Sequence, residues 1–289
     1  MDFKKVGVLG AGIMGAGIAQ VAAQAGMQVV MRDVEDRFLE KGMDTIKQSL
    51  GRMVKKEKTT QADADAAVAR IRCTKDLVEA AKGVDVVIEA IPEILSLKIE
   101  TYRVMDRECA PHVIFASNTS GLSITEMASA TKRPDRFIGM HFFNPVPMMQ
   151  LIEIVKGFST SGETVKTIEA LSAKMGKTSI VVSDTPGFAT TRLIGVLQNE
   201  AIHAYAEGIA SAADIDKGMR LGMNHPMGPL ELADFVGLDT LLHCMDNLYR
   251  EYGDPKYRPP LLLRQMVRAG HLGRKTGRGF YDYTQKKSG

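Results

Sequence analysis

Residues 6–33 read VGVLGAGIMGAGIAQVAAQAGMQVVMRD, and this stretch decides the fold of the chain. It places the spacing Gly10-x-Gly12-x-x-Gly15 between a short β-rich run and a long run of helix-forming residues. A second apolar run follows and leads to Asp33. The glycine spacing alone is a weak signal, but the order of strand, glycine turn, helix, strand and acid is typical of a dinucleotide-binding unit.

Each glycine of this motif has a physical role. Gly10 permits a tight turn, Gly12 lets the backbone approach a pyrophosphate, and Gly15 lets the helix pack closely on the strand. The first helical turn, which includes Ile13 and Met14, offers backbone N–H groups and the positive end of the helix dipole to the phosphates. We therefore predict that these five residues bind the diphosphate of a dinucleotide.

Asp33 follows the second apolar run, and its carboxylate is expected to accept hydrogen bonds from the adenosine ribose hydroxyls. A 2′-phosphate at this position would meet a negative charge, so the sequence favours NAD over NADP. Arg32 beside it is the kind of residue that accommodates a 2′-phosphate, which keeps NADP open as the alternative.

The same stretch resembles a membrane segment in one respect, because residues 6–31 carry no charge. A run of this length could span a bilayer, and Lys4-Lys5 before it imitates the start of a signal peptide. Six glycines and three glutamines lower the hydrophobicity of the run, and Asp2 interrupts the basic segment. We expect neither a membrane span nor a secretory signal.

The composition is that of a globular protein with a small net charge. Of the 289 residues, 45% are hydrophobic and 25% are charged. A formal net charge of +3 is too small to indicate a nucleic-acid partner. Cys73, Cys109 and Cys244 form no CxxC pair and indicate neither a disulfide framework nor a zinc site. We expect a cytoplasmic protein that holds no metal.

Strand-like and helical stretches alternate through residues 1–184. This pattern predicts an α/β fold with a doubly wound Rossmann-type sheet as the NAD-binding domain. Residues 35–70 are rich in helix formers and are interrupted at Thr59-Thr60, so we expect a helical-hairpin arm inserted between two strands.

A domain boundary is predicted at the segment Asp184-Thr-Pro-Gly187, since Pro and Gly together end regular structure. Residues 185–289 then show helical patterns only, including one helix predicted over residues 229–249. We expect an all-helical second domain that, by analogy with other Rossmann proteins, binds substrate and dimerises.

The densest group of chemically active side chains lies in residues 139–153, GMHFFNPVPMMQLIE. If the two apolar runs form a hairpin about Pro147, His141 faces Glu153. In a dehydrogenase, such an imidazole takes the hydroxyl proton as hydride leaves the same carbon, and the carboxylate orients the ring and stabilises its cation. A lone histidine on a strand is more often a core residue, but its pairing with a glutamate beside a nucleotide loop favours catalysis.

Ser120 follows an apolar run at residues 113–117, at what would be the carboxyl end of a strand. Open α/β sheets bind their ligands at that edge, so Ser120 could hydrogen-bond a substrate oxygen. The alternative is a helix cap or a turn, where Asn, Thr and Ser are common. The spacing does not decide between them.

Six motifs occur in the order found in the L-3-hydroxyacyl-CoA dehydrogenases, which the chain resembles over essentially its whole length. The motifs are the glycine loop, SNTS (117–120), HFFNPVP (141–147), DTPGF (184–188), PMGPLEL (226–232) and GRKTGRGFY (273–281). The chain is most similar to the bacterial 3-hydroxybutyryl-CoA dehydrogenases, which lack a fused hydratase.

The resemblance implies a role for each residue that matches a family motif. His141 would be the catalytic base and Glu153 its partner. Ser120 and Asn144 would lie at the nicotinamide and at the substrate carbonyl.

The resemblance also implies contacts on both sides of the reacting centre. Glu93 and Lys98 would contact the nicotinamide ribose, and Lys275 would reach the cofactor from the C-terminal segment. On the helical arm, Ser49 and Lys56 would hold the adenosine phosphate of CoA. From the residues alone, the arm's lysines could equally be a solvated helical face.

Thr191 departs from the family pattern. The family commonly has Asn in the motif Pro-Gly-Phe-x-x-Asn-Arg, where its amide helps to bind the substrate carbonyl, but this chain has Thr191 before Arg192. A threonine hydroxyl is shorter than an amide and has a single donor. Polarisation of the carbonyl would then be weaker or would depend on Ser120 and water.

The resulting expectation is an NAD-dependent enzyme that interconverts (S)-3-hydroxyacyl-CoA and 3-oxoacyl-CoA, with short chains such as 3-hydroxybutanoyl-CoA and acetoacetyl-CoA. The resemblance further implies a homodimer. Two alternatives remain open, namely a sugar-acid (gulonate-type) dehydrogenase on the same scaffold and a non-catalytic NAD-binding structural protein. The arm lysines discriminate, because only a CoA substrate needs them.

Overall fold

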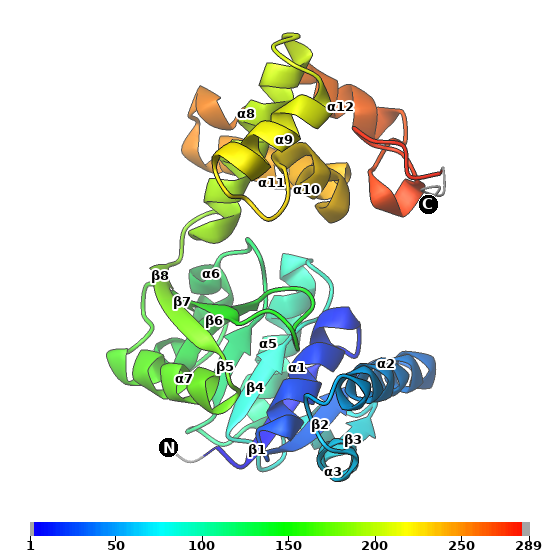
Figure 1. Cartoon of the computed structure of the whole chain (residues 1–289). Helices are drawn as coiled ribbons and strands as arrows, with labels where there is room; N and C mark the ends of the chain where they lie inside the picture. Colours follow the sequence, from blue (N-terminus) through cyan, green and yellow to red (C-terminus); the bar gives the residue numbers. More distant parts are fainter. Residues whose placement is uncertain (1–2, 285–289) are drawn as a thin grey trace. The chain divides into compact units, whose positions relative to one another are not determined.

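The computed structural model describes residues 3–284. The chain forms two compact units, Met1–Thr185 and Pro186–Gly289, and each is described by itself (Figure 1). The N-terminal unit is built on a β-sheet, whereas the C-terminal unit is built from helices.

Within the described residues, the N-terminal unit holds an eight-stranded sheet with the order β3-β2-β1-β4-β5-β6-β7-β8. The strands are β1 Lys5–Leu9, β2 Gln28–Arg32, β3 Ile71–Thr74, β4 Val86–Glu89, β5 Ile114–Ser117, β6 Phe137–Phe142, β7 Leu151–Lys156 and β8 Thr178–Ser183. Neighbouring strands are parallel except for the antiparallel pair β6 and β7. The central strands β4 and β5 are buried along their whole length, as expected where helices cover both faces. The predicted doubly wound sheet is confirmed.

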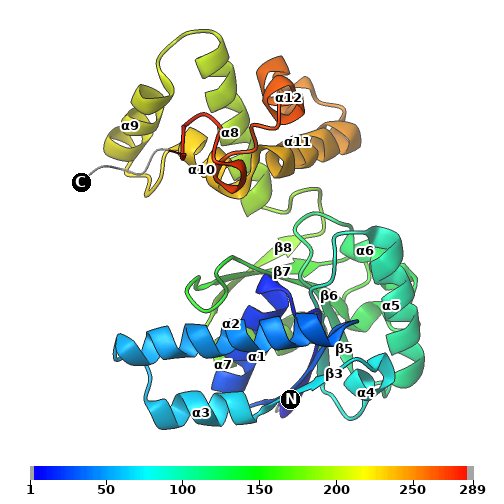
Figure 2. The same ribbon diagram turned by 90° about the vertical axis from the view of Figure 1, so that its right-hand side faces the viewer.

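The helices of this unit lie on two sides of the sheet. They are α1 Ile13–Gln24, α2 Asp36–Lys55, α3 Gln61–Ala69, α4 Leu77–Ala81, α5 Leu95–Glu108, α6 Ile124–Ser129 and α7 Gly162–Lys174, with a 3-10 turn at Pro134–Arg136. Figure 2 shows α1, α2, α3 and α7 on one side and α4, α5 and α6 on the other. The sequence pattern misses the short helices α4 and α6, each of which begins at a side-chain cap, Asp76 and Ser123.

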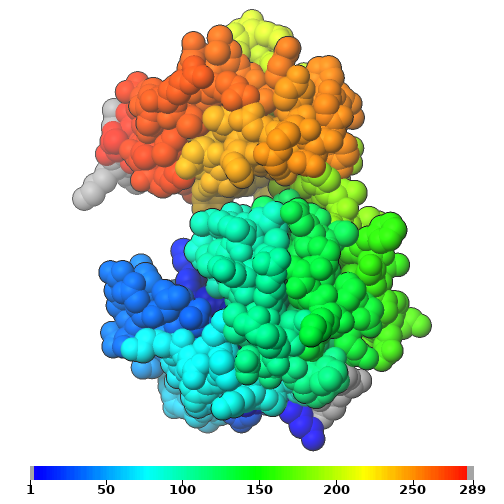
Figure 3. Space-filling model, turned by 180° about the vertical axis from the view of Figure 1, so that it is seen from behind, coloured from blue at the N-terminus to red at the C-terminus, as the bar shows by residue number. Residues whose placement is uncertain are grey.

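Helices α2 and α3 form the predicted helical-hairpin arm. The buried face of α2 carries Leu39, Gly42, Ile46 and Leu50, a spacing of three or four residues that places them on one side of the helix. A Cβ atom at Gly42 would lie 2.7 Å from the carbonyl oxygen of Ala11, so glycine lets the arm pack against the dinucleotide turn. In Figure 3 the arm (blue) stands at the edge of the unit with its outer face open to solvent.

The C-terminal unit contains helices around its own hydrophobic core. They are α8 Thr190–Ala206, α9 Ala212–Gly222, α10 Pro229–Val236, α11 Leu238–Tyr252 and α12 Leu261–Arg268, with 3-10 turns at Pro255–Tyr257 and Arg274–Thr276. Ile202, Leu230, Leu238, Met245 and Leu263 are fully buried together in this core. The unit therefore has the helical character that the sequence predicts.

The prediction of one helix over residues 229–249 is wrong. Gly237 has φ +106°, a backbone conformation that side-chain-bearing residues rarely adopt, and it separates α10 from α11. The apolar periodicity continues on both sides of the break, so it could not reveal the glycine kink.

Candidate active site

The glycine turn after β1 has the geometry of a phosphate cradle. Gly10 has φ +102°, and a Cβ atom there would lie 2.5 Å from the carbonyl oxygen of Ala90 on the neighbouring strand end. A Cβ atom at Gly15 would lie 1.9 Å from the carbonyl oxygen of Gly10, so only glycine fits. A Cβ atom at Gly12 would meet no atom within 4 Å, which leaves its backbone accessible to a ligand. These residues fit a bound pyrophosphate.

Helix α1 presents its N-terminus beside this turn. Its N-cap is Gly12, which makes no side-chain cap, and its first turn holds no acidic residue. The first N–H groups of a helix have no acceptor within the helix, so those of Ile13 and Met14 are suited to an anion. Ile13 is 71% exposed and Met14 is half-buried.

Gly17, in the second turn of α1, was missed by the sequence reasoning. A Cβ atom there would lie 2.7 Å from the Cβ atom of Val146, in the loop that follows His141 and Asn144. The glycine lets that loop approach the dinucleotide helix. The signal was present, because the GAG of residues 10–12 recurs at residues 15–17.

Asp33 is held by backbone groups next to the glycine turn. Its two carboxylate oxygens accept hydrogen bonds from the N–H of Ala11 and the N–H of Val34, both at 2.7 Å. The adjacent Arg32 donates its Nε to the carbonyl oxygen of Lys75 at 3.1 Å. This placement of a carboxylate at the end of β2 fits a ribose diol better than a 2′-phosphate.

His141 and Glu153 form a buried pair on adjacent strands. The antiparallel register of β6 and β7 sets His141 directly opposite Glu153, which confirms the pairing predicted from a hairpin about Pro147. The Nδ1 atom of His141 lies 2.7 Å from Oε2 of Glu153, and the two residues are 5% and 0% exposed. The carboxylate fixes the proton on Nδ1, so that Nε2 can accept a proton from a substrate.

The ring of Phe143 packs against the imidazole of His141, with 4.6 Å between the ring centroids. Together with Glu153, it restricts the orientation of the imidazole. Asn144 is exposed just beyond the end of β6. Lys177 stabilises the loop beyond it by donating its Nζ to the carbonyl oxygen of Met149 at 2.8 Å.

Ser120 lies in the loop after β5, and two hydrogen bonds fix this loop. The backbone N–H of Ser120 donates to Oε1 of Glu93 at 3.0 Å. The side-chain oxygen of Asn118 accepts from the N–H of Phe142 at 2.9 Å, next to His141. Ser120 is exposed, so its hydroxyl is available at the carboxyl edge of the sheet.

Lys98 pairs with Glu93 and also with Glu89, a buried residue that the sequence reasoning missed. Lys98 is 1% exposed, and its Nζ lies 3.2 Å from Oε2 of Glu93. The same Nζ donates to the fully buried carboxylate of Glu89, the last residue of β4. The sequence signal was an acid that closes the apolar run at residues 86–88.

The arm residues Ser49 and Lys56 lie in the C-terminal part of α2 and at its C-cap, respectively. Ser49 is half-buried, whereas Lys56 caps the helix and is exposed. Lys55 and Lys58 are exposed beside it. The arm therefore offers a cluster of positive charge to an anionic group.

Thr191 and Lys275 belong to the C-terminal unit, and their contacts are described within it. Thr191 is half-buried in the first turn of α8. Asn199, further along α8, donates its amide to the carbonyl oxygen of Arg258 at 3.2 Å and is a core residue of this unit. Lys275 pairs with Asp239, its Nζ lying 2.7 Å from Oδ2.

The motif around Lys275 also contains residues that hold the C-terminal segment against α10. Buried Asp234 accepts hydrogen bonds from the N–H groups of Phe280 and Tyr281, both at 3.0 Å. A Cβ atom at Gly279 would lie 1.9 Å from Oδ1 of Asp234, so only glycine fits at this position. These contacts fix the segment that carries Lys275.

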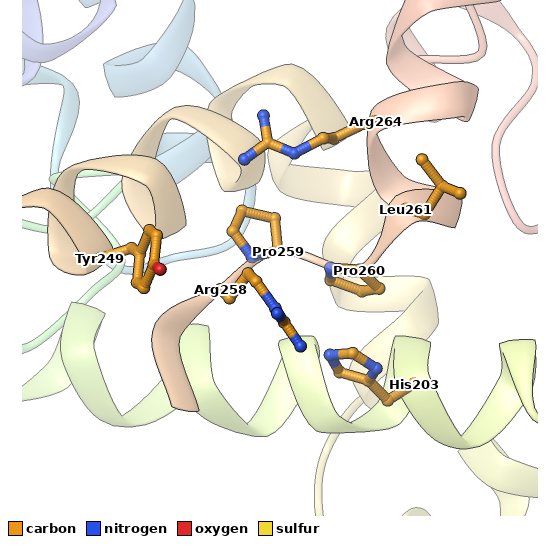
Figure 4. Close-up of a pocket in the computed structure, with 7 residues that line it drawn as sticks. All are labelled: His203, Tyr249, Arg258, Pro259, Pro260, Leu261 and Arg264. Atoms are coloured by element: carbon orange, nitrogen blue, oxygen red, sulfur yellow. The ribbon is translucent and has the colours of Figure 1, made fainter. Parts of the chain in front are cut away.

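A separate pocket of about 380 Å³ lies in the C-terminal unit (Figure 4). His203 of α8, Tyr249 of α11 and the segment that carries Arg258 and Arg264 line it. The guanidinium of Arg264 is paired with Asp246. None of the residues predicted to be catalytic or cofactor-binding lines this pocket.

Comparison with known proteins places both units in one family. Residues 5–185 match the family model described as the NAD binding domain of 3-hydroxyacyl-CoA dehydrogenase. Residues 187–283 match the C-terminal domain of the same family. The chain belongs to the 3-hydroxyacyl-CoA dehydrogenase family. It is therefore an NAD-dependent oxidoreductase that acts on CH–OH groups.

Several members of this family are similar over nearly the whole chain. A Bacillus subtilis protein named "Probable 3-hydroxybutyryl-CoA dehydrogenase" is 51% identical, with 100% of both chains covered. The 3-hydroxybutyryl-CoA dehydrogenase of Clostridioides difficile is 44% identical over 97% of this chain and 100% of its own. The crystal structure of (S)-3-hydroxybutyryl-CoA dehydrogenase PaaH1 from Ralstonia eutropha superposes with a TM-score of 0.96 at 50% identity, covering 98% of this chain and 100% of that one.

The described helices include none that is long and apolar enough to cross a membrane. The apolar stretch at the start of the chain is instead strand β1 and helix α1 of the NAD-binding unit. Most of its residues are buried in the core of this unit, which explains the lack of charge there.

Proposed function

We propose that this family member interconverts (S)-3-hydroxyacyl-CoA and 3-oxoacyl-CoA thioesters, with short chains such as 3-hydroxybutanoyl-CoA and acetoacetyl-CoA as substrates. The buried pair of His141 and Glu153, in the sheet whose strand ends hold the dinucleotide cradle, carries this proposal. The names of the similar Bacillus, Clostridioides and Ralstonia proteins support the short acyl chain.

In the oxidative direction, Nε2 of His141 removes the proton of the 3-hydroxyl group. Glu153 on Nδ1 stabilises the imidazolium that forms, because a carboxylate at 2.7 Å compensates its charge. The glycine turn and Asp33 would hold NAD⁺, which would supply the acceptor for the hydride of C3. In the reductive direction, the protonated His141 returns the proton to the developing alkoxide.

Four residues of the N-terminal unit would orient the reactants. The hydroxyl of Ser120 and the amide of Asn144 would hydrogen-bond the substrate carbonyl and the nicotinamide. Glu93 and Lys98 would bind the nicotinamide ribose, since Glu93 is fixed by Ser120 and Lys98 by Glu89. We assign the diphosphate to Gly10, Gly12, Ile13, Met14 and Gly15, and the adenosine ribose to Asp33.

Two residues of the C-terminal unit would complete the site. Thr191 would donate its hydroxyl to the substrate carbonyl in place of the family's asparagine. Lys275 would reach the cofactor from a segment that Asp234 and Asp239 hold in place.

The arm would bind the adenosine phosphate of CoA through Ser49 and Lys56. Exposed ammonium groups recognise phosphate as point charges and need no enclosed pocket. The lysines on either side of Lys56 strengthen the local positive potential.

We also propose that the enzyme is a cytoplasmic homodimer that associates through its C-terminal unit. Leu221 and Leu261 are 79% and 64% exposed in this unit, and a partner subunit that covered them would bury this apolar surface. The three cysteines are free thiols, in keeping with a reducing compartment. Sedimentation equilibrium that gave the mass of one chain would refute the dimer.

The experiment that tests the activity follows NADH absorbance in parallel reactions. NADH is supplied with acetoacetyl-CoA and with free acetoacetate, and NAD⁺ is supplied with a sugar acid. The proposal predicts fast turnover of the thioester only. Turnover of the sugar acid alone would establish the gulonate-type alternative. Tight NADH binding without turnover of any of the three would make the protein a non-catalytic NAD binder.

A further inference from the structure

Three ionisable side chains meet where β4 ends and α5 begins. Glu89 is fully buried, Lys98 is 1% exposed, and the side chain of Glu93 is 44% exposed. The Nζ atom of Lys98 donates to Glu89, lies 3.2 Å from Oε2 of Glu93 and donates to the carbonyl oxygen of Ile91 at 3.2 Å. The ammonium group of Lys98 therefore forms ion pairs with both carboxylates.

The hydrogen bonds around Glu89 suit an ionised carboxylate. Its oxygens accept from Lys98, from the N–H of Ile91 at 2.8 Å and from the hydroxyl of Ser117 at 2.7 Å. Burial raises the pKa of Glu89 above its ordinary value, and the charge of Lys98 with the hydrogen bonds from these three donors opposes part of the rise. With Glu89 and Glu93 both ionised, the cluster carries one negative charge in excess.

This cluster, Glu89–Glu93–Lys98, lies beside the cofactor cradle. Residue Ala90 directly follows Glu89, and its carbonyl oxygen is the atom that excludes a side chain at Gly10. The strand order changes direction between β1 and β4, which is the point where an open α/β sheet binds a dinucleotide. The glycine turn and Asp33 lie on the β1 and β2 side. We therefore expect the nicotinamide half of the dinucleotide to bind at the ends of β4 and β5.

We propose that Glu89 sets the preference of the site between the two redox states of its cofactor. The excess negative charge of the cluster attracts the cationic nicotinamide ring of NAD⁺ and has no such effect on the neutral ring of NADH. Glu89 is fully buried, so it would act through the charge that it adds next to Lys98 and Glu93 and not by contact with the ring. The proposal depends on the NAD-binding role of the unit and not on the choice of acyl-CoA.

The size of the effect follows from Coulomb's law. A unit charge about 10 Å from the ring, acting through an effective dielectric constant of about 20 to 40, changes a dissociation constant roughly fourfold to fifteenfold. The charge on Glu89 is buried, so salt screens it less than a surface charge.

Glu89→Gln tests the proposal, because an amide retains the shape and can still accept from Lys98 and donate to the hydroxyl of Ser117. Dissociation constants for NAD⁺ and NADH are measured by calorimetry on the full-length protein, without acyl-CoA. We expect the constant for NAD⁺ to rise about fourfold to fifteenfold and that for NADH to stay within about twofold. Equal changes in both constants, or no change in either, would overturn the proposal and leave the acyl-CoA assignment untouched.

Asp106→Asn is the matched control. Asp106 is a buried carboxylate on the same helix, α5, and it is paired one to one with Arg133 at 2.7 Å. Removing its charge should leave the ratio of the two dissociation constants unchanged within about twofold, because it lies at the opposite end of α5.

The double variant Glu89→Gln, Lys98→Met provides a second test that does not depend on the single variant. Both charges are removed together, so Glu93 again leaves one negative charge in the cluster. We expect the ratio of the NAD⁺ and NADH constants to return to within about twofold of the original protein, even where both affinities fall. A ratio like that of Glu89→Gln alone would show that the charge of the cluster does not determine it.

Discussion

A buried carboxylate is costly unless a partner compensates it, and Glu153 is fully buried. Its partner His141 carries an imidazole, the side chain that most often serves as a general acid or base. Phe143 packs on the imidazole and leaves it little freedom to rotate. A residue pair of this kind is prepared for proton transfer before substrate arrives.

His141→Ala removes the proposed base. We expect kcat to fall by roughly 10²- to 10⁴-fold, the usual contribution of a positioned acid or base, while the Kd for NADH stays within about twofold. The matched control is His112→Ala, an exposed histidine of the same unit. Near-normal kcat in His141→Ala would exclude His141 from the mechanism.

The resemblance of the surrounding motif implies that Thr191 stands where the family commonly has asparagine. We expect Thr191→Asn to keep or to raise kcat/KM for acetoacetyl-CoA, by up to roughly fivefold, because an amide reaches further and has two donors. Steady-state kinetics with NADH measure this change in kcat/KM. A large loss of activity would mean that the site is rebuilt around the threonine hydroxyl.

Asp239 and Lys275 give a residue-scale prediction about pH. Burial raises the pKa of Asp239, but hydrogen bonds from Lys275 and from backbone N–H groups outweigh it, so its pKa lies below 3.8. The folded protein then binds this proton more weakly than the unfolded chain does. The stabilisation is complete well above pH 3.8 and is lost as the pH falls through the lower folded pKa.

Both side chains of this pair are more than a third exposed, which limits its contribution to about 1 kcal/mol or less. The check is the difference in unfolding free energy between the original protein and Asp239→Asn. We expect a constant difference from about pH 5 to 8 that shrinks below pH 3.8. A difference that grows on acidification would contradict the assigned direction.

At the scale of elements, the hairpin of β6 and β7 shows what sequence spacing can predict. Two apolar runs joined by a short proline-containing turn leave few registers, and the one centred on Pro147 places His141 opposite Glu153. The acid that closes the run at residues 86–88 was a signal for Glu89, but it does not show that Lys98, nine residues later, turns back onto this carboxylate. Likewise, apolar periodicity does not reveal the positive φ angle of Gly237 that separates α10 from α11.

The arm formed by α2 and α3 is the element that we propose to distinguish a CoA substrate from a small hydroxy acid. We expect the triple variant Lys55→Gln, Lys56→Gln, Lys58→Gln to raise the KM for acetoacetyl-CoA roughly tenfold with little change in kcat, since exposed ion pairs contribute up to about 1 kcal/mol each. Steady-state kinetics at low and high salt measure it, and the effect should shrink at high salt.

The control for the arm removes the same charge elsewhere in the N-terminal unit. Lys82→Gln, Lys132→Gln, Lys166→Gln changes three exposed lysines outside the arm. An equal rise in KM in both triple variants would show that KM depends on the net charge of the protein and not on a binding site at the arm.

At the scale of the whole molecule, the fold class could be read from the first 33 residues and the later alternation of strands and helices. The reaction class could be read from the order of the motifs. Two features of the site could not be predicted from the sequence. Thr191 and Lys275 lie in a different compact unit from His141, and no local pattern fixes distances between units. The acyl chain length depends on the shape of a substrate pocket, which motifs do not encode.

Hydride transfer between NADH and C3 of an acyl-CoA is the central claim, and isotope transfer tests it most directly. Acetoacetyl-CoA is reduced with NADH that carries deuterium on one face of the nicotinamide C4, and the product is analysed by mass spectrometry and chiral chromatography. We predict (S)-3-hydroxybutanoyl-CoA with deuterium at C3 from one face of the ring and none from the other. Hydrogen derived from solvent at C3, or no reduced thioester, would contradict the account.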